Sequence, residues 1–579
     1  MLELLRRRVP LIGLLGQYPG HHLRGDITAG LTTAVMLVPQ AMAYATLAGM
    51  PPVTGLYASV VPVVLYALLG TSGSLAVGPV AIVALLTASA VAPLANGDPA
   101  TYIVLASALA LLVGAVQLLL GVLRLGMVAD LLSHAVISGF TSAAALLIAT
   151  SQLRSLTGID APGGDTFVER MISIGSNVDS LHPATLVVGA ASIVGLVVLK
   201  RRWPRFPGPL VVVAVATAAA GVLSLDQRGV ALLGEIPSGL PAPQLPAVSV
   251  EQLASLVVPA LIIGLLSYLE GISVAKAIAT RTGERIDATQ ELIATGAANL
   301  GAAVFQAFPV AGGFSRTAVN FQAGARTPLA GLITAAVVAL SVLVLTPLFT
   351  DLPSAVLAAI VIVAVAGLVD VAGARHAWHT DRWDTAILAT TFLATLGLGV
   401  ELGIGVGVAA SLVLLVARLA RPHLAELGRL PGTSRYRNVH RYTTDQDPRV
   451  LLVRIDGPLL FANAHTVTRK LEGLVDARDD RLQAVVLDAS AITDVDGDGV
   501  NVFDELERTL STRDGVDFHL ATVRGPVRDA LGRADRWDAW CDAGRIHEDV
   551  PSALVELGLA PEDDRTPDAV TAPPSGATN

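Results

Sequence analysis

Apolar runs long enough to cross a membrane dominate the first three quarters of the chain. A helix spans the hydrocarbon core of a bilayer with about 20 predominantly apolar residues. Runs that reach or approach this length predict fourteen segments in two sets of seven. The first set is 27–47, 53–70, 79–95, 101–123, 129–152, 184–199 and 208–224. The second set is 254–275, 287–306, 314–324, 328–348, 353–370, 383–399 and 402–420.

Charged residues between these segments alternate in sign from one loop to the next. With a cytoplasmic N-terminus, the outside loops are mostly acidic and the inside loops mostly basic. The basic residues of the inside loops are Arg124, Lys200, Arg201, Arg202, Arg205, Arg281, Arg285, Arg326, Arg375 and Arg382. Basic loops stay in the cytoplasm, so we predict a cytosolic lead-in at 1–25, a transmembrane domain at 26–424 and cytoplasmic termini.

The hydrophobic period changes after the last apolar run. Short apolar stretches at 450–456, 482–488 and 518–523 predict strands, and helical patterns follow at 463–478, 499–512, 525–533 and 550–558. Strands that alternate with helices indicate a small α/β domain, which we place at 435–558. Residues 559–579 are rich in proline, aspartate and threonine, and we expect a disordered tail there.

Composition agrees with a membrane protein. Of 579 residues, 53% are hydrophobic and 15% charged, against about 25% charged in soluble domains. The net charge of −9 argues against a nucleic-acid surface. The single cysteine, Cys541, excludes an intrachain disulfide. Arginine far outnumbers lysine, which we interpret as the mark of a GC-rich bacterial genome, and hence of a bacterial inner membrane.

Two of the predicted segments are poor spans and occupy matching places. Segments 79–95 and 314–324 begin at Gly-Pro and Gly-Gly, and each is third in its set of seven. An odd number of spans per set inverts the second repeat (about 250–424) relative to the first (about 26–230). Interrupted helices at matching positions of inverted repeats indicate a transporter's binding site. The alternative is that the glycines only allow close helix packing.

Two long blocks resemble a known family. They read LVPQAMAYATLAGMPPVTGLYASVVPVVLYALLGTS (37–72), followed by LAVGPVAIVALLT, and QELIATGAANLGAAVFQAFPVAGGFSRTAVNFQAGARTPLAG (290–331). Both are similar to conserved blocks of the sulfate permease family (SulP, solute carrier family 26). The C-terminal domain resembles that family's STAS domain, which is similar to anti-sigma-factor antagonists. The resemblance implies a core and a gate domain, a homodimer, and a substrate held between the third and tenth helices.

The two interrupted helices suit an anion. A helix N-terminus has unpaired N–H groups and about half a positive charge, so two that meet at mid-membrane make an anion site. The resemblance adds pocket positions on the first and third helices, among them Gln40 and Tyr44, for which an interhelical hydrogen bond and packing are the alternatives. The candidate substrate-binding residues are Gln40, Tyr44, Gly78, Pro79, Val80, Ala81, Gly313, Phe314, Ser315 and Arg316.

Glu270 lies inside the eighth segment, where a charge is expensive and usually functional. The resemblance places this residue near the substrate, and we predict that it accepts the coupling proton. The alternative is a permanent ion pair with Arg316. A sodium site is less favoured, because Val274 stands where a hydroxyl ligand would help, although Ser273 is close by.

The C-terminal domain departs from its relatives at one point. Anti-sigma-factor antagonists have Asp-Ser-Ser-Gly, and the second serine is phosphorylated; here the stretch is Asp496-Gly497-Asp498-Gly499. Asp498 cannot be phosphorylated, which leaves a docking or dimerisation role for the domain.

The predicted function is secondary active transport of a small anion, with proton-coupled sulfate uptake favoured. Alternatives are transport or exchange of bicarbonate, chloride or dicarboxylates, an anion channel, and an anion-sensing signalling protein. No metal, dinucleotide or P-loop pattern is present, so we expect no cofactor and no enzymatic activity. The energy would come from an ion gradient.

Overall fold

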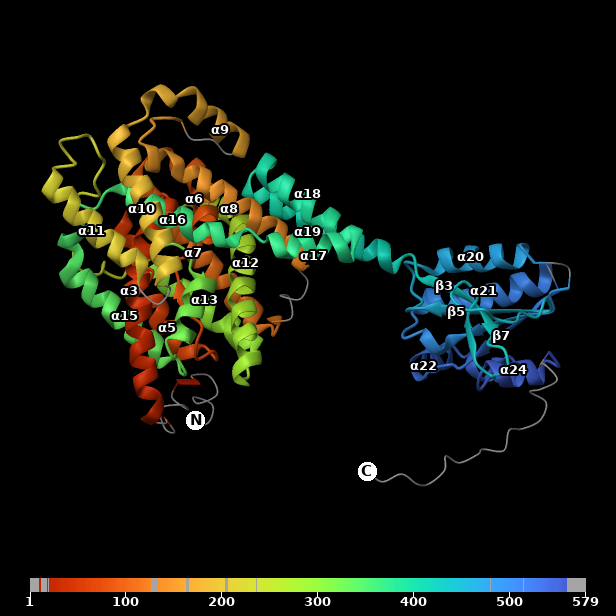
Figure 1. Ribbon diagram of the computed structural model, residues 1–579. Coiled ribbons are helices and arrows are strands. Elements are labelled where there is room, and N and C mark those ends of the chain that lie inside the picture. The colour runs from red at the N-terminus through yellow and green to blue at the C-terminus, as the bar shows by residue number, and fades with distance from the viewer. Residues whose placement is uncertain are drawn as a thin grey trace, which may run out of the picture. The chain divides into compact units, whose positions relative to one another are not determined.

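The fourteen predicted membrane segments each have a helical counterpart in the computed structural model (Figure 1). The structure describes residues 10–11, 18, 20–126, 133–162, 166–203, 207–235, 237–478, 481–513 and 515–559. The predicted tail after 559 and most of the lead-in lie outside these residues. Contacts between residues divide the chain into two compact units, Met1–Ser411 and Leu412–Asn579.

The first repeat contains seven predicted spans, the second of which is broken into two helices. They are α3 (Leu23–Leu47), α4 (Pro52–Tyr57) with α5 (Val61–Leu69), α6 (Ala81–Ala95), α7 (Pro99–Val122), α8 (His134–Thr157), α10 (Pro183–Arg202) and α11 (Gly208–Leu223). The second repeat has α12 (Val250–Thr282), α13 (Ala288–Val304), α14 (Phe314–Gln322), α15 (Leu329–Leu340), α16 (Ser354–Val365), α18 (Arg382–Leu398) and α19 (Val400–Leu419). Among the described residues, nine helices are long and apolar enough to cross a membrane.

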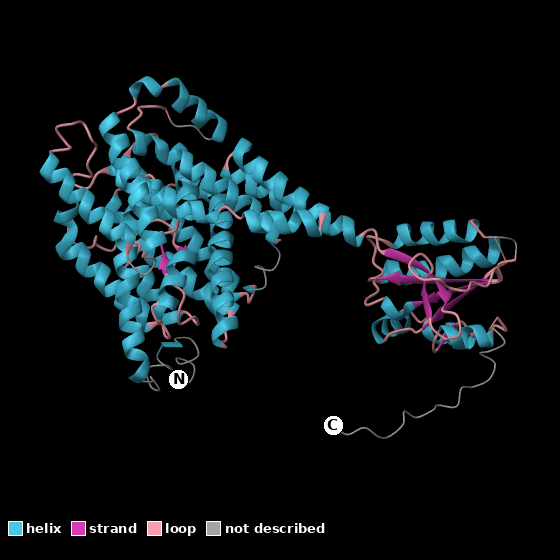
Figure 2. Ribbon diagram, viewed as in Figure 1, coloured by secondary structure: helices cyan, strands magenta, loops and turns pink. Residues whose placement is uncertain are grey.

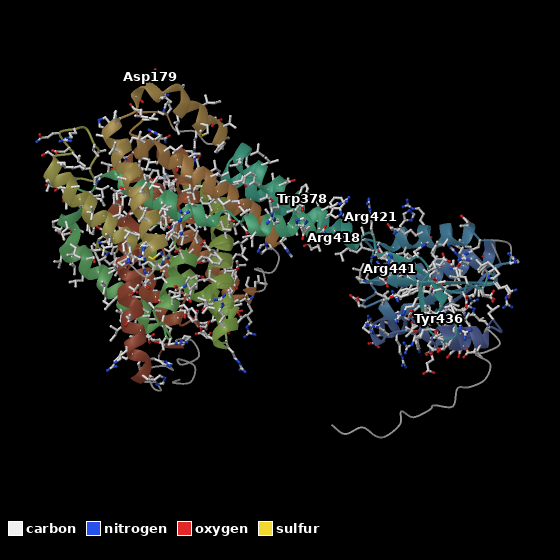
Figure 3. All side chains as sticks on the ribbon, viewed as in Figure 1. Asp179, Trp378, Arg418, Arg421, Tyr436 and Arg441 are labelled. Carbon is white, nitrogen blue, oxygen red and sulfur yellow. The ribbon has the colours of Figure 1, made fainter. Side chains whose placement is uncertain are left out.

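Two short helices between the spans were not predicted. Helix α9 (Phe167–Ser176) and helix α17 (Val371–Thr380) contain no buried residue. Trp378 of α17 is 71% exposed (Figure 3). Their apolar side chains recur on one face only, so neither helix forms an apolar run of spanning length.

The helices of the first unit pack in two groups. The first, which we call the core group, consists of α3–α7 and α12–α15: α13 packs against α7 and α5, and α15 packs against α3. The second, the gate group, contains α8, α10, α11, α16 and α18: α8 packs against α16 and α18, and α10 against α16 and α11. Each group takes equivalent helices from both repeats, as the predicted fold of core and gate requires.

The second unit is built on a six-stranded sheet (Figure 2). Its strands, in spatial order, are β4 (Tyr436–Asn438), β3 (His423–Arg429), β5 (Val450–Asp456), β6 (Ala484–Asp488), β7 (Asp517–Ala521) and β8 (Ile546–His547). Strand β3 is antiparallel to β4 and β5, whereas β5, β6, β7 and β8 are parallel. The three predicted strands are present. Strands β3, β4 and β8 were missed, because they are either short or rich in charged and polar residues.

Helices cover both faces of this sheet. They are α20 (Ala464–Asp476), α21 (Gly497–Arg513), α22 (Gly525–Arg533), α23 (Trp537–Asp542) and α24 (Val550–Glu556). Alternate residues of β5 point to opposite faces. Leu451 and Val453 pack with residues of α20 and α21, and Leu452 packs with residues of α24.

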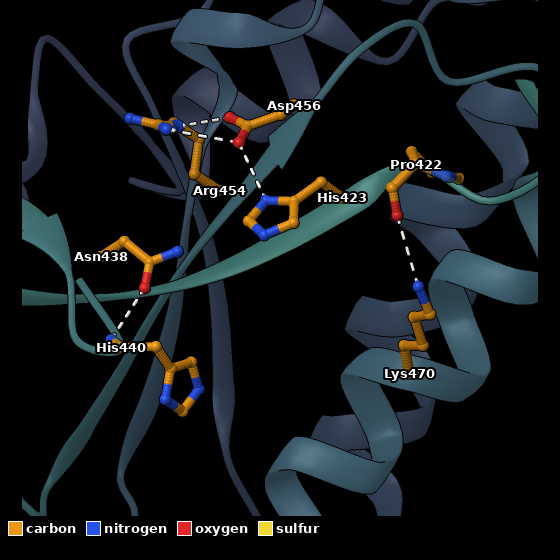
Figure 4. A network of polar contacts seen from close by, with 7 residues as sticks. All are labelled: Pro422, His423, Asn438, His440, Arg454, Asp456 and Lys470. Carbon is orange, nitrogen blue, oxygen red and sulfur yellow. Dashed lines mark hydrogen bonds and ion pairs between the residues drawn. The ribbon is translucent and has the colours of Figure 1, made fainter. Parts of the chain in front are cut away.

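Polar contacts attach β3 to the rest of the domain (Figure 4). His423 Nδ1 lies 3.0 Å from Asp456 Oδ2, and Arg454 Nε donates to Asp456 Oδ1 at 2.6 Å. Lys470 Nζ donates to the carbonyl oxygen of Pro422 at 3.3 Å. Strand β3 therefore belongs to the sheet, although it precedes residue 435, where the predicted domain begins.

Candidate functional site

The two interrupted helices begin side by side. Strand β1 (Val77–Gly78) pairs antiparallel with strand β2 (Ala311–Gly312), so that Val77 lies opposite Gly312 and Gly78 opposite Ala311. Figure 2 shows this pair inside the helical unit. Helix α6 starts three residues after β1, and helix α14 two residues after β2. Sequence positions 235 apart are thus brought into direct contact.

Neither helix start is capped by a side chain. The cap residues are Val80 for α6 and Gly313 for α14, and neither makes a side-chain capping hydrogen bond. A methyl group on Gly313 would lie 3.3 Å from Val80 Cγ1, so the two caps are immediate neighbours. N–H groups at the two helix starts therefore have no side-chain acceptor at the cap, and can bind an anion.

Arg316 joins the two helix starts. Its side chain is 3% exposed. Nε and Nη2 donate to the carbonyl oxygen of Ala76 at 3.2 and 3.1 Å, and Nη1 donates to that of Pro79 at 3.0 Å. Gly78, with φ of +152°, lies against this guanidinium, since a Cβ there would be 3.3 Å from Nη2. One positive charge of α14 is thus held beside the start of α6.

Buried polar side chains that were not among the predicted site residues hold the strand pair. Thr317 Oγ1 accepts from Ala76 N at 3.0 Å, and Asn320 Nδ2 donates to Ser74 O at 2.9 Å. On the β2 side, Asn299 Oδ1 accepts from Val310 N at 2.8 Å. Asn299 Nδ2 also donates to Gln117 Oε1 at 3.0 Å. Polar side chains inside apolar spans were the signal that could have found them.

Glu270 of helix α12 lies beside β2. Its neighbour Gly271 allows helix α12 to approach the strand, because a Cβ on Gly312 would be 2.9 Å from Gly271 Cα. Glu270 Oε2 is buried, and no hydrogen-bond partner reaches it within the described part of the chain. The alternative of an ion pair is not seen: among the described residues no salt bridge joins Glu270 to Arg316.

A cavity of about 200 Å³ separates the core group from the gate group beside α14. Gln40 of α3 and Ser315 of α14 line its core side. Lys200 of α10, which was predicted only as a loop charge, lines the gate side. The remaining lining residues are Met36, Leu196, Gly208, Pro209, Val319, Ile360, Val363 and Ala364.

The other predicted site residues are less accessible. Tyr44, four residues after Gln40 on α3, is buried, as are Val80 and Ala81. Gly78, Pro79 and Gly313 are buried around the strand pair. Phe314, by contrast, is 49% exposed at the first residue of α14. The predicted residues of α6 and α14 are brought together, and their role in binding stays a prediction.

Comparisons with known proteins identify two matching families and similar transporters. Residues 23–391 match the model of the Sulfate permease family, and residues 441–537 that of the STAS domain. The chain is 40% identical over 524 residues to a probable sulfate transporter of Mycobacterium tuberculosis, covering 90% of this chain and 93% of that relative.

Solved structures share the fold. The murine Solute Carrier 26 family member A9 anion transporter, in the inward-facing state, matches with a TM-score of 0.89 at 26% identity over 95% of this chain and 94% of that one. The transmembrane domain of a cyanobacterium bicarbonate transporter matches with a TM-score of 0.60 at 26% identity, covering 68% of this chain and 97% of that one.

Proposed function

Because the chain belongs to the sulfate permease family, a family of membrane transporters and not of enzymes, we propose that it takes up sulfate together with a proton. Anion transport by a multi-pass membrane protein follows from the family. Beyond that, we propose sulfate as the substrate and the proton as the driving ion. We further propose a homodimer in a bacterial inner membrane, with both termini in the cytoplasm.

The meeting of the two helix N-termini at β1 and β2 is the observation that carries the proposal. Each N-terminus contributes about half a positive charge, and the buried guanidinium of Arg316 adds a full one between them. Such a site attracts an anion and repels a cation. Backbone N–H donors and the Ser315 hydroxyl can hydrogen-bond the oxygens of sulfate.

Glu270 supports the choice of a proton. A buried carboxylate oxygen without a hydrogen-bond donor is expensive while it is charged. Protonation removes that charge and offsets one of the two charges of sulfate. Uptake of the anion then draws on the proton gradient.

Bicarbonate is the second candidate substrate, because a cyanobacterium bicarbonate transporter shares the fold of the membrane unit. A site built from backbone N–H groups does not by itself distinguish sulfate from bicarbonate, chloride or a dicarboxylate. Selection among them would rest on the side chains around the site, among which Gln40 and Ser315 line the cavity.

Uptake of labelled sulfate into proteoliposomes, with a panel of unlabelled competitors, tests the proposal. We expect an inward proton gradient to drive accumulation, and unlabelled sulfate to compete better than bicarbonate, chloride or a dicarboxylate. Gly313→Val should abolish uptake, because its side chain would press on Val80 and Arg316. Gly397→Val in α18 is the control, since a Cβ there meets open space. Bicarbonate uptake in the absence of sulfate uptake would contradict sulfate as the substrate. The absence of any anion flux would contradict anion transport itself.

A further inference from the structure

We propose that Lys200 is a substrate-recruiting residue, which attracts the anion into the cavity between the gate group and the core group before the anion reaches the helix starts. This inference rests on the proposed anion transport and adds a residue, from the other helix group, to the path of the anion. Lys200 belongs to a loop that the charge pattern predicts to be cytoplasmic. The inference therefore concerns anion that enters the cavity from that face, in exchange or in reverse transport, and not its tight binding.

The position of Lys200 on its helix aims the side chain at the cavity. Leu196 and Lys200 both line the cavity, and they are four residues apart on α10. Residues at this spacing share one face of a helix. Leu196 is buried and Lys200 is exposed, so this face passes from the closed interior to the open mouth. Lys200 stands in the last helical turn, where a cation is favourable.

The neighbouring basic residues do not share this placement. Arg201 and Arg202 follow Lys200 in the same last turn, but neither lines the cavity. The guanidinium of Arg202 stacks on the ring of Trp203 at 5.5 Å. Arg201 is therefore a matched control: it is a cation one residue further along the same helix, and it does not line the cavity.

Lys200 is the one charged residue among the described residues that line this cavity. No carboxylate in the described part of the chain forms a salt bridge with it. A positive charge at the mouth of a cleft with low-dielectric walls raises the local concentration of anions and their rate of entry. Across the cavity, Gln40 and Ser315 offer uncharged hydrogen-bonding groups next to the start of α14. An anion would meet the ammonium group first and the hydroxyl afterwards.

The two sides of the cavity belong to different helix groups. Lys200 lies on α10 of the gate group, whereas Ser315 lies on α14 of the core group. Any movement of one group against the other changes the separation of these residues. The effect of Lys200 should therefore be confined to the membrane face onto which this cavity opens.

The test compares Lys200→Ala, Lys200→Arg and Arg201→Ala in full-length protein of known orientation in liposomes. Labelled sulfate flux is measured with substrate supplied from either face. We expect Lys200→Ala to raise the KM about five- to tenfold from the face that carries α10's last turn, with kcat and the KM from the opposite face unchanged. Lys200→Arg should restore the KM, and Arg201→Ala should match the unaltered protein. The KM difference should shrink at high salt, because ions screen the charge.

Three outcomes would overturn the inference: an unchanged KM in Lys200→Ala, an equal effect from both faces, or an equal effect of Arg201→Ala. If Lys200→Ala fails to fold, Lys200→Gln gives the same comparison with an uncharged side chain of similar length. Failure of the proposed function is recognised separately, because the unaltered protein would then carry no sulfate. The same variants are in that case assayed with labelled chloride.

Discussion

Two glutamates of the core group, Glu291 and Glu270, are held in opposite ways. Glu291, near the start of α13, is 1% exposed and accepts hydrogen bonds from Tyr66 Oη, Thr71 N, Thr71 Oγ1 and Ser72 N at 2.7 to 3.2 Å. Glu270, inside α12, has a buried Oε2 that no donor reaches among the described residues. One carboxylate is saturated with donors, and the other is left open.

We interpret this difference as one between a structural role for Glu291 and the proposed coupling role of Glu270. Glu291 ties the loop that precedes β1 to helix α13, and so fixes one arm of the site. Its lone pairs are already used. An open carboxylate contributes nothing to such an anchor, and in a low-dielectric site it is costly unless it takes up a proton or meets a cation. A protein keeps such a group where its change of charge is useful.

The largest effect is expected from removing the saturated carboxylate. Glu291→Leu leaves two hydroxyl groups and two backbone N–H groups without their acceptor. We expect a loss of roughly 3–5 kcal/mol in the free energy of unfolding, because each buried donor keeps its desolvation penalty. The melting transition in detergent measures this. Glu251→Leu, at an exposed position of α12, should leave the transition in place. Equal shifts of the melting transition in the two variants would contradict the anchoring role of Glu291.

The same contrast recurs in the second unit, where a chain of polar contacts runs from the exposed carboxylate of Glu556 to a buried atom without a partner among the described residues. His547 Nδ1 lies 2.7 Å from Glu556 Oε2, and His547 Nε2 lies 3.0 Å from His519 Nδ1. His519 Nε2 is buried and, within the described residues, unpartnered. Burial of the imidazole, together with the charge of His547, lowers the pKa of His519 from 6.5 to about 4.

This chain predicts a stability that depends on pH. The folded domain keeps His519 neutral, whereas the unfolded chain binds a proton below its ordinary pKa. Stability is therefore complete above about pH 6.5 and falls by roughly 2 kcal/mol as the pH drops to about 5. Hydrogen exchange of β8 and α24 in the full-length protein at pH 7 and pH 5 measures it. His519→Leu should reduce the dependence of stability on pH. If the protection of β8 and α24 in the unaltered protein showed no loss of stability between pH 7 and pH 5, the prediction would be wrong.

The smallest effect is expected at the start of α21, where two aspartates differ in the same way. Asp496 accepts from Gly499 N at 2.9 Å and from Phe461 N at 2.8 Å, whereas Asp498 is exposed in the first turn. We expect Asp496→Ala to cost about 1 kcal/mol, as a lost cap does, and Asp498→Ala no more than roughly 0.5 kcal/mol. Chemical denaturation followed by a probe in the C-terminal domain compares them. A larger loss of unfolding free energy in Asp498→Ala than in Asp496→Ala would show that Asp498, and not Asp496, stabilises the start of α21.

Much of the fold could be predicted because it follows from local patterns. The long apolar runs located the spans, and the matched Gly-Pro and Gly-Gly breaks located α6 and α14. Helices α9 and α17 were missed because amphipathic helices of ten residues give no spanning run. Strand β3 was missed because charged and polar residues interrupt its apolar ones.

The candidate site was only partly predictable. Its backbone positions follow from the repeat. Asn299 and Asn320 could be noticed as polar residues inside apolar spans, but their partners could not, because those contacts join segments far apart in the sequence. Lys200 was predicted only as a loop charge, because the sequence does not show that it lines the cavity. Arg316 shows the limit best. The sequence suggested a charge beside a helix start or an ion pair with Glu270, and the structure shows a guanidinium that donates to the carbonyl oxygens of Ala76 and Pro79.

Glu270→Gln is the decisive variant, because we propose that Glu270, the open carboxylate, carries the coupling proton. Glutamine keeps the size of the side chain but cannot ionise. Gradient-driven accumulation of labelled sulfate and counterflow exchange are measured in the same proteoliposomes. We expect accumulation to disappear, exchange to persist and the melting transition to stay in place. Undiminished proton-driven accumulation in the variant would contradict the proposed coupling role.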